Sequence, residues 1–210
     1  METKDYKIIK GKIPIILSAP HALKHYRNAI WKQADTNTDY IALQIQKKTN
    51  CHVIYRSVES MSDPNYDEFD VSEYKQAMLE YIKEQDIKLL IDLHGSKYER
   101  DYLIELGTCD DSDSSLKQRK WIAKMMIMML EEMLKDKIDY FHKGITKNRV
   151  FKASSPNTIT RSISLRSDCS CIQMEINSYL RCFDEKDCEY FIDVMIDVVN
   201  CLNKVLQYPK

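Results

Sequence analysis

The 210-residue chain is 44% hydrophobic and 30% charged, so it is long and apolar enough to bury the core of one globular domain spanning 1–210. Its formal net charge of −1 gives no electrostatic reason to expect a nucleic-acid or anionic-membrane partner. No apolar run approaches the roughly 20 residues of a membrane span, and the N-terminal stretch METKDYKIIKGKIP lacks the apolar core of a signal peptide. Seven irregularly spaced cysteines are then interpreted as free thiols, and we expect a cytoplasmic protein.

Glycine is the most informative residue count. The chain has only four, and no two of them lie close together: Gly11, Gly95, Gly107 and Gly144. The G-x-G-x-x-G dinucleotide fingerprint, the phosphate-binding P-loop and the G-x-S-x-G nucleophile elbow all need closely spaced glycines. Those classes of enzyme are therefore excluded.

The first half of the chain predicts strands and helices in alternation. Apolar runs at 13–18 and 52–56 predict strands, and the apolar periodicity of 38–48 predicts a helix between them. After the polar loop SMSDPNYDEFD, a helix is expected at about 72–85, with Ser72 as its N-cap. The runs LLIDLH, at 89–94, and YLIEL, at 102–106, predict two further strands.

The second half continues this alternation. Residues 109–115 are acidic and polar and predict a loop, whereas WIAKMMIMMLEEMLKDK, at 121–137, predicts a buried helix whose methionines fill gaps in the core. Residues 143–170 are weakly periodic, so we expect a loop with short structured pieces. A strand is predicted at 171–176 and an amphipathic helix at 185–206. The alternation indicates an α/β fold with a mostly parallel mixed sheet flanked by helices.

Two histidines lie where predicted strands end. IPIILSAPHA runs into His21 and KLLIDLHGS into His94, and ligands of parallel sheets bind beyond the carboxyl ends of the strands. Between them, ADTNTD offers Asp35 or Asp39 as an oxygen ligand. Two histidines and a carboxylate are the ligands of a hydrolytic zinc site that keeps one position open. Glu175 lies on a predicted buried strand, where a carboxylate is costly unless it is paired or functional.

Each of these residues also has a structural interpretation. A single strand-end histidine most often serves as a hydrogen-bond partner, Asp35 or Asp39 would cap the following helix, and Glu175 would form an ion pair. Four cysteines offer a rival structural zinc site but contain no C-x-x-C pair: Cys169, Cys171, Cys182 and Cys188. A cysteine nucleophile with His142 has no supporting spacing. The remaining histidines are expected at the surface or in structural roles: His25 and His52.

Six short motifs follow one another along the chain: PH at 20–21, D-x-x-x-D at 35–39, D-P-N at 63–65, D-L-H-G at 92–95, I-E-L-G-T at 104–108 and Q-M-E-I-N at 173–177. In this order and at these intervals, they resemble the motifs of the N-formylglutamate amidohydrolases. The resemblance runs from about residue 13 to residue 181. That family is similar in fold to zinc carboxypeptidases and to aspartoacylase-like deacylases.

The resemblance implies a zinc carboxypeptidase-like fold and a zinc ion as cofactor. Three residues are expected as zinc ligands by their position in the motifs: His21, Asp35 and His94. Glu175 is expected as the general base and acid, and Asn65 as a residue that orients a small-molecule substrate. The implied reaction is hydrolysis of the amide bond of a small N-acyl or N-formyl amino acid. Asp92 lies on the same side of its strand as His94, and we expect it to orient that histidine.

The chain departs from the family at two motifs. Ala22 and Leu23 follow PH, where the family has glycine or serine-glycine, and Tyr66 follows D-P-N, where the family has an arginine that binds a substrate carboxylate. Either another arginine takes this role, or the substrate is not an N-acyl glutamate. The candidate arginines are Arg56, Arg100, Arg149, Arg166 and Arg181. We expect Arg56 and Arg166 in the substrate site. The alternative functions are a zinc peptidase or deacylase with a different substrate, and a non-catalytic module whose site has decayed.

Overall fold

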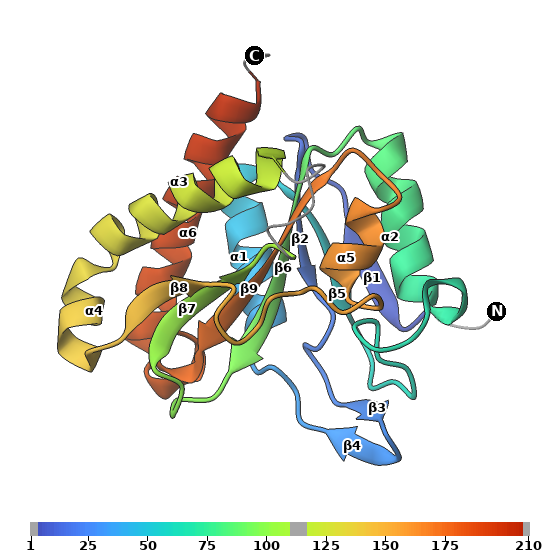
Figure 1. The fold of residues 1–210 in the computed structure, drawn as a ribbon, viewed down its shortest axis with the longest axis horizontal. Coiled ribbons are helices and arrows are strands. Elements are labelled where there is room, and N and C mark those ends of the chain that lie inside the picture. The colour runs from blue at the N-terminus through green and yellow to red at the C-terminus, as the bar shows by residue number, and fades with distance from the viewer. Residues whose placement is uncertain (1–3, 110–116, 208–210) are drawn as a thin grey trace.

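A seven-stranded β-sheet forms the centre of the protein, with helices packed on both of its faces (Figure 1). The computed structural model describes residues 4–109 and 117–207. Across the sheet, the strands follow in the order β1 (Tyr6–Ile9), β5 (His52–Arg56), β2 (Ile15–Ala19), β6 (Leu89–Ser96), β9 (Ser170–Asn177), β7 (Tyr102–Gly107) and β8 (Gly144–Lys147).

Most neighbouring strands of this sheet are parallel. The run β5, β2, β6 and β9 is parallel throughout, and β8 is parallel to β7. Strand β1 is antiparallel to β5, and β7 is antiparallel to β9. The predicted α/β fold with a mostly parallel mixed sheet is therefore confirmed. Because β2, β6 and β9 are parallel neighbours, their carboxyl ends meet at one edge of the sheet, where a ligand site is expected.

Alternation along the strands directs side chains to two different helix layers. Ile91 and Leu93 of β6 face the larger layer. Leu90 faces the smaller layer. Asp92 and His94 follow Leu90 on that second side, so this face of β6 changes from apolar to polar toward the carboxyl end of the strand. The larger layer consists of α1 (Thr38–Thr49), α3 (Lys117–Met133) and α6 (Glu185–Leu206), and the smaller one of α2 (Glu73–Glu84) and α5 (Ile159–Ser164).

Capping residues mark the starts of two long helices. Ser72 caps α2 as predicted, because its hydroxyl accepts a hydrogen bond from the backbone N–H of Lys75. Asp184 caps α6 in the same way through the N–H of Lys186, at 2.8 Å. The apolar face of α6 is buried against the sheet and α1, as its periodicity predicted.

The structure corrects the predicted elements in several places. Three short strands were not predicted: β1, β3 (His25–Arg27) and β4 (Ile30–Lys32). The helix predicted at 121–137 is divided at Leu134 into α3 and α4 (Lys135–Phe141). Strand β8 and helix α5 are the short pieces expected within 143–170, and residues 110–115 of the predicted loop lie outside the described residues. The described residues also form two short turns: a 3-10 turn, η1 (Phe69–Val71), and a π-helical turn, η3 (Tyr179–Phe183). None of the described helices is long and apolar enough to cross a membrane.

Candidate metal centre

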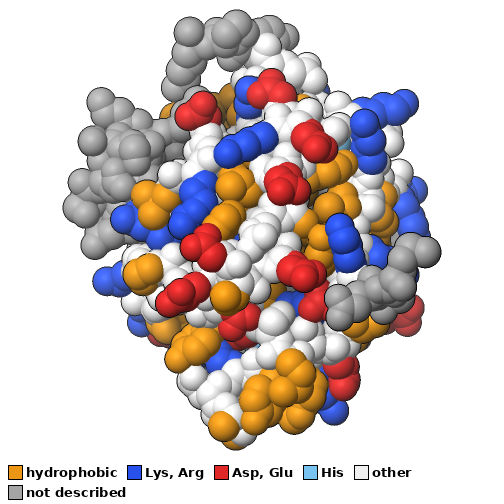
Figure 2. Space-filling view, turned by 90° about the vertical axis from the view of Figure 1, so that its right-hand side faces the viewer, with side chains coloured by type: hydrophobic (Ala, Val, Ile, Leu, Met, Phe, Trp, Pro, Cys, Tyr) orange, Lys and Arg blue, Asp and Glu red, His pale blue; other side chains and the backbone are white. Residues whose placement is uncertain are grey.

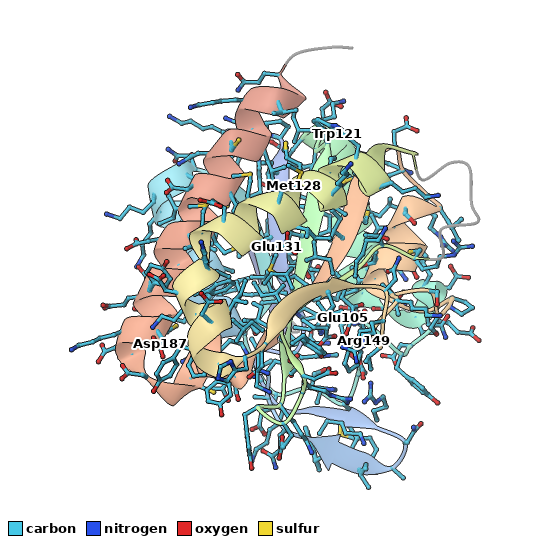
Figure 3. The ribbon with its side chains drawn as sticks, turned by 60° about the vertical axis from the view of Figure 1, so that its left-hand side comes forward. Glu105, Trp121, Met128, Glu131, Arg149 and Asp187 are labelled. Carbon is cyan, nitrogen blue, oxygen red and sulfur yellow. The ribbon has the colours of Figure 1, made fainter. Side chains whose placement is uncertain are left out.

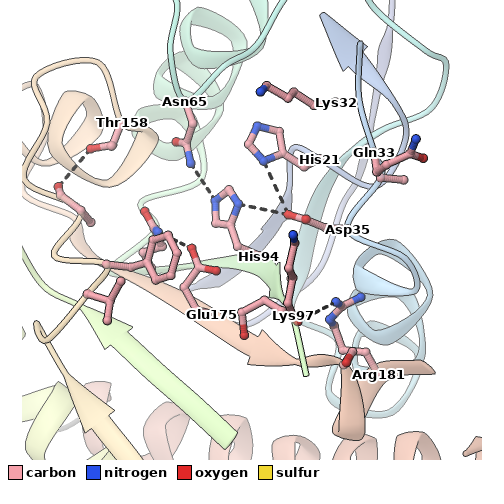
Figure 4. A pocket seen from close by; sticks show the side chains of 18 of the residues that line it. His21, Lys32, Gln33, Asp35, Asn65, His94, Lys97, Thr158, Glu175 and Arg181 are labelled. Carbon is pink, nitrogen blue, oxygen red and sulfur yellow. Dashed lines mark hydrogen bonds and ion pairs between the residues drawn. The ribbon is translucent and has the colours of Figure 1, made fainter. Parts of the chain in front are cut away.

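His21, Asp35 and His94 converge at the carboxyl edge of the sheet (Figure 4). His21 follows β2, and His94 lies near the end of the adjacent β6. The segment after β4 returns to this edge, where the N–H of Asp35 donates to the carbonyl of His21 at 2.8 Å. Nδ1 of His21 lies 3.5 Å and Nδ1 of His94 lies 3.4 Å from the same oxygen, Oδ2 of Asp35. One donor atom from each residue therefore lies within 4.8 Å of the others, close enough to bind one ion.

The opposite nitrogen of each imidazole faces a buried carboxylate. Nε2 of His21 lies 2.7 Å from Oδ1 of Asp63, and Nε2 of His94 lies 3.0 Å from Oδ2 of Asp92. A carboxylate favours the tautomer with a proton on Nε2, which leaves the Nδ1 lone pair for a metal. Two imidazole nitrogens and one carboxylate oxygen are a donor set that suits zinc and leaves room for a fourth ligand. The residues therefore fit a zinc ion.

The side chains of this site shift one another's pKa values. Burial by itself lowers the pKa of each histidine, but Asp63 acting on His21, Asp92 acting on His94, and Asp35 acting on both outweigh it, so the pKa of both imidazoles is raised. The same hydrogen bonds outweigh the burial of Asp35 and hold the pKa of its carboxyl well below its usual range. The site therefore favours positive charge between the two histidines and Asp35.

The absence of a side chain at Gly95 lets Arg181 approach Asp35. A Cβ atom at position 95 would lie 2.6 Å from Cζ of Arg181 and 3.0 Å from Cβ of Asp35. The guanidinium donates to the carbonyls of Ile176, at 2.9 Å, and Ser96, at 3.3 Å, and also to that of Thr36. Arg181 thus connects the ends of β6 and β9 to the segment that carries Asp35.

Glu175 lies beside His94, since the two residues are register partners on β9 and β6. Its side chain is buried and accepts a hydrogen bond from Nε2 of Gln173 at 2.7 Å. Burial raises the pKa of Glu175, although the nearby His94 opposes that rise. Asn65 reaches the same place from the loop after β5, where its amide nitrogen lies 2.9 Å from Nε2 of His94. The structure thus brings five predicted residues together: His21, Asp35, Asn65, His94 and Glu175.

These residues line a cavity of about 860 Å³. Residues 150–155 form one of its walls, and a buried carboxylate on β7 holds that segment in place. Oε1 of Glu105 accepts hydrogen bonds from the N–H groups of Arg149, Val150 and Phe151, at 2.6, 2.5 and 3.0 Å. Figure 3 shows Glu105 and Arg149 next to each other. Three amide donors on one oxygen compensate the burial of its charge.

Other expected residues lie elsewhere. Asp39 lies in the first turn of α1 and does not line the cavity, so Asp35 is the aspartate that the fold brings to the histidines. Arg56 and Arg166 are also absent from the cavity lining, which corrects their expected place in the substrate site. Packing directs Arg56 to Asp5 and Ser62, whereas the guanidinium of Arg166 lies 4.2 Å from the ring centroid of Phe69.

Three residues of the site were not recognised in the sequence. Asp63 was noted only as part of D-P-N, whereas its Oδ1 binds both His21 and the N–H of Asn65, at 2.9 Å. His25 is buried and stacks on His21, with 4.0 Å between ring centroids. Arg27 lines the cavity. Together with His21, two of these residues form a second group of potential metal ligands: His25 and Asp63. Because Asp63 is fully buried and does not line the cavity, the group around Asp35 is the one that a substrate can reach.

The cysteine alternatives find no support in the described part of the chain. Neither group of potential metal ligands there contains a cysteine, and no cysteine lines the cavity. His52 has a structural role, because its Nδ1 accepts a hydrogen bond from the N–H of Gly11 at 3.1 Å and lies 2.8 Å from the hydroxyl of Tyr81.

Solved structures provide the comparison with known proteins. N-formylglutamate amidohydrolase from Ralstonia eutropha JMP134 superposes with a TM-score of 0.62 at 11% identity, over 95% of this chain and 97% of the other. A bacteriophage poly-γ-glutamate hydrolase gives 0.57 at 13% identity, over 95% and 90% of the two chains. A metallo-carboxypeptidase from Burkholderia cenocepacia gives 0.55 at 10% identity, over 98% and 66%. No protein-family model and no curated protein matches the sequence.

The chain has the fold of N-formylglutamate amidohydrolase and metallo-carboxypeptidase. This result supports, at the level of fold, the family resemblance found in the six motifs. At 10 to 13% identity, this similarity is one of fold.

Zinc binding should depend on pH in a direction set by the two histidines. Because the pKa of both imidazoles is raised, protons stabilise the metal-free fold below the ordinary histidine value of about 6.5, and this stabilisation is lost as pH rises through the raised values. Over the same range, neutral imidazole becomes available to the metal. We therefore expect the zinc-induced increase in Tm to grow as pH rises from about 6.5 through the raised pKa values of the two histidines. An increase that stays constant over this range would contradict this account.

Asp92→Asn should weaken zinc binding about 10- to 100-fold, because Nε2 of His94 loses its charged partner. Asp63→Asn should act in the same way on His21. Competition with a chromophoric chelator would measure both affinities. Asp39→Asn is the matched control and should bind zinc like the parent protein, since Asp39 lies outside the site. Equal affinity in all four proteins would rule out the roles of Asp63 and Asp92.

Proposed function

We propose that the protein is a zinc-dependent amidohydrolase that cleaves the amide bond of a small N-acyl amino acid, with N-formyl amino acids included. One observation carries this proposal. The Nδ1 atoms of His21 and His94 converge on Asp35, and Glu175 lies next to His94 in the register of the sheet, at the wall of an open cavity. Such a site offers metal ligands and a proton acceptor to one bound molecule.

Three residues would hold the ion and leave it open to the cavity. His21, Asp35 and His94 would bind zinc, while Asp63 and Asp92 keep the proton of each imidazole on Nε2. A zinc ion in such a site polarises a carbonyl and activates water. Since Asp35 and His94 also line the cavity, a substrate amide can reach this position.

Glu175 is the proposed general base and acid. As a carboxylate, it would take a proton from the attacking water; as the acid, it would return that proton to the nitrogen of the leaving amine. The second half of this cycle benefits from a raised pKa, which burial gives to Glu175. The hydrogen bond from Gln173 holds one carboxylate oxygen in place, and Asn65 is the proposed residue that orients the substrate.

The names of the structural neighbours support the reaction class. An N-formylglutamate amidohydrolase, a poly-γ-glutamate hydrolase and a metallo-carboxypeptidase are all named for the cleavage of amide or peptide bonds. The size of the cavity favours a second candidate, a zinc peptidase or deacylase with a longer substrate. About 860 Å³ is near the upper end of the usual range for small-molecule sites and exceeds the needs of a formyl amino acid.

Glu175→Gln should retain the fold and bind zinc like the parent protein. It should lose at least about 10²-fold in turnover, because the variant keeps the shape of the side chain but cannot accept the proton. The assay is hydrolysis of a panel of N-formyl amino acids, longer N-acyl amino acids and short peptides by zinc-loaded protein, with zinc content measured in parallel. The best substrate in this panel also decides between the two candidate functions.

Glu99→Gln is the matched control, because Glu99 is another carboxylate of the cavity lining but is not a register partner of His94. It should hydrolyse the best substrate at a rate close to that of the parent. Parent-like turnover by Glu175→Gln would refute the mechanism. Loss of zinc from Glu175→Gln would make Glu175 a ligand rather than the base.

A further inference from the structure

A short hairpin stands at the mouth of the cavity, formed by β3 and β4 at the lower end of the molecule in Figure 1. Its two-residue turn has positive φ at both central residues, 52° at Asn28 and 60° at Ala29, as a type I′ turn requires. Arg27 pairs with Ile30, and His25 pairs with Lys32. This pairing fixes which side chains share a face of the hairpin.

The two faces of the hairpin differ in chemistry. Three residues on one face line the cavity: His25, Arg27 and Lys32. On the other face, Tyr26 pairs with Trp31, and their rings meet edge to face with 5.7 Å between centroids. Trp31 is 48% exposed on this second face, whereas Ile30 pairs with Arg27, lies on the first face beside the turn and is 53% exposed. Figure 2 shows hydrophobic side chains gathered at the lower end of the molecule, where the hairpin lies. The hairpin thus turns its basic face inward to the cavity.

Contacts with the metal centre fix the position of this basic face. The ring of His25 stacks on that of His21, and its Nε2 lies 3.5 Å from Oδ2 of Asp63. The N–H of Tyr26 donates to the carbonyl of Ser60 at 3.0 Å, and the N–H of Ser60 donates to the carbonyl of Lys24 at 3.3 Å. The cations of the hairpin are therefore held at a set place relative to the proposed zinc ligands, and Lys32 and His21 line the same cavity (Figure 4).

Arg27 and Lys32 have hydrogen-bond donors available for an anion. Nη1 of Arg27 lies 3.1 Å from Oδ2 of Asp63, the guanidinium lies 5.9 Å from the ring centroid of Tyr66, and about a third of the side chain is exposed. Lys32 forms no ion pair with any residue in the described part of the chain. Two more lysines of the lining, Lys97 and Lys152, likewise have no acidic partner among the described residues. Five lysine or arginine side chains line the cavity against three aspartate or glutamate side chains, so the cavity attracts negative charge although the whole chain has a net charge of only −1.

We propose that the inner face of the β3–β4 hairpin is the specificity element of the site. Arg27 and Lys32 bind a carboxylate of the substrate at a distance from its reacting amide, with the guanidinium fork of Arg27 as the directional donor. This proposal rests on the proposed function, and it narrows the substrate class to amides that carry a carboxylate away from the scissile bond. Tyr66 contributes by packing against Arg27.

The test uses α,ω-dicarboxylates from succinate to adipate, each compared with the monocarboxylate of equal carbon number. None of these molecules contains an amide, so binding is measured without turnover. Isothermal titration calorimetry on the full, zinc-loaded chain should show that at least one dicarboxylate binds about tenfold more tightly than its monocarboxylate, since a hydrogen bond to a charged group typically contributes that much. Absence of any such preference would overturn the proposal.

Variants separate recognition from a structural role of the hairpin. Lys32→Gln should lose most of the dicarboxylate preference. Its zinc affinity should equal that of the parent, because Lys32 forms no ion pair with Asp35, the carboxylate among the proposed zinc ligands. Arg27→Lys should retain part of the preference and Arg27→Gln should lose it. Lys24→Gln, which removes an equal charge outside the cavity, should behave like the parent. If Arg27→Gln only weakens zinc binding and Lys32→Gln leaves the preference intact, Arg27 merely compensates the charge of Asp63 and the proposal fails.

The two proposals fail in distinguishable ways. If the hairpin variants change the dicarboxylate preference but the protein hydrolyses no amide of the panel, the proposed function is refuted and the proposed anion-binding role of the hairpin is supported. Hydrolysis of amides without any dicarboxylate preference would keep the proposed function and refute the role of the hairpin.

Discussion

Two buried carboxylates control the direction of both histidines, and the rest of the site depends on that control. Asp63 and Asp92 are fully buried, and each faces the Nε2 atom of one imidazole. An isolated carboxylate in such surroundings is costly, so Asp92 depends on His94, and Asp63 depends on His21 together with Arg27 and the N–H of Asn65. With Nε2 engaged, both rings turn Nδ1 toward Asp35. The five side chains therefore form one unit that favours a cation at its centre, and the loss of any member leaves another with an uncompensated charge.

The sheet supplies the geometry that this unit needs. Strands β2, β6 and β9 are parallel neighbours, so His21, His94 and Glu175 reach the same edge although they are far apart in the sequence. Alternation keeps Leu93 in the hydrophobic core while its neighbours Asp92 and His94 lie on the polar side. The core thus stabilises the strand whose other face carries the site, and the same residues that pack the fold determine the direction of the ligands.

Buried carboxylates also hold the parts of the cavity that are not strand ends. Oε1 of Glu105 accepts hydrogen bonds from the N–H groups of residues 149–151, and these bonds hold the cavity wall formed by residues 150–155 in place. Asp63 likewise holds the β3–β4 hairpin in place, because it contacts His25 and Arg27 of that hairpin as well as His21. One physical device, a carboxylate that is stable only when several donors surround it, therefore orders both the metal ligands and the walls that a substrate contacts.

The sequence by itself determined the elements with strong local signals. Apolar runs located β2, β5, β6, β7 and β9 to within a few residues. Residue chemistry at the strand ends pointed to His21, His94 and Glu175, the family resemblance added Asp35 in preference to Asp39, and the fold brings these four residues together. Only the tertiary structure decided the partners. Asp63 lies 42 residues from His21, a separation over which no periodicity acts, and the β3–β4 turn has Asn-Ala rather than the glycine that signals such a hairpin. Arg56 and Arg166 had the right chemistry for a substrate site, but packing directs them away from the cavity. Sequence patterns encode which residues are buried and on which side of a strand they lie, whereas the direction of a long polar side chain depends on charges that only the folded chain brings near it.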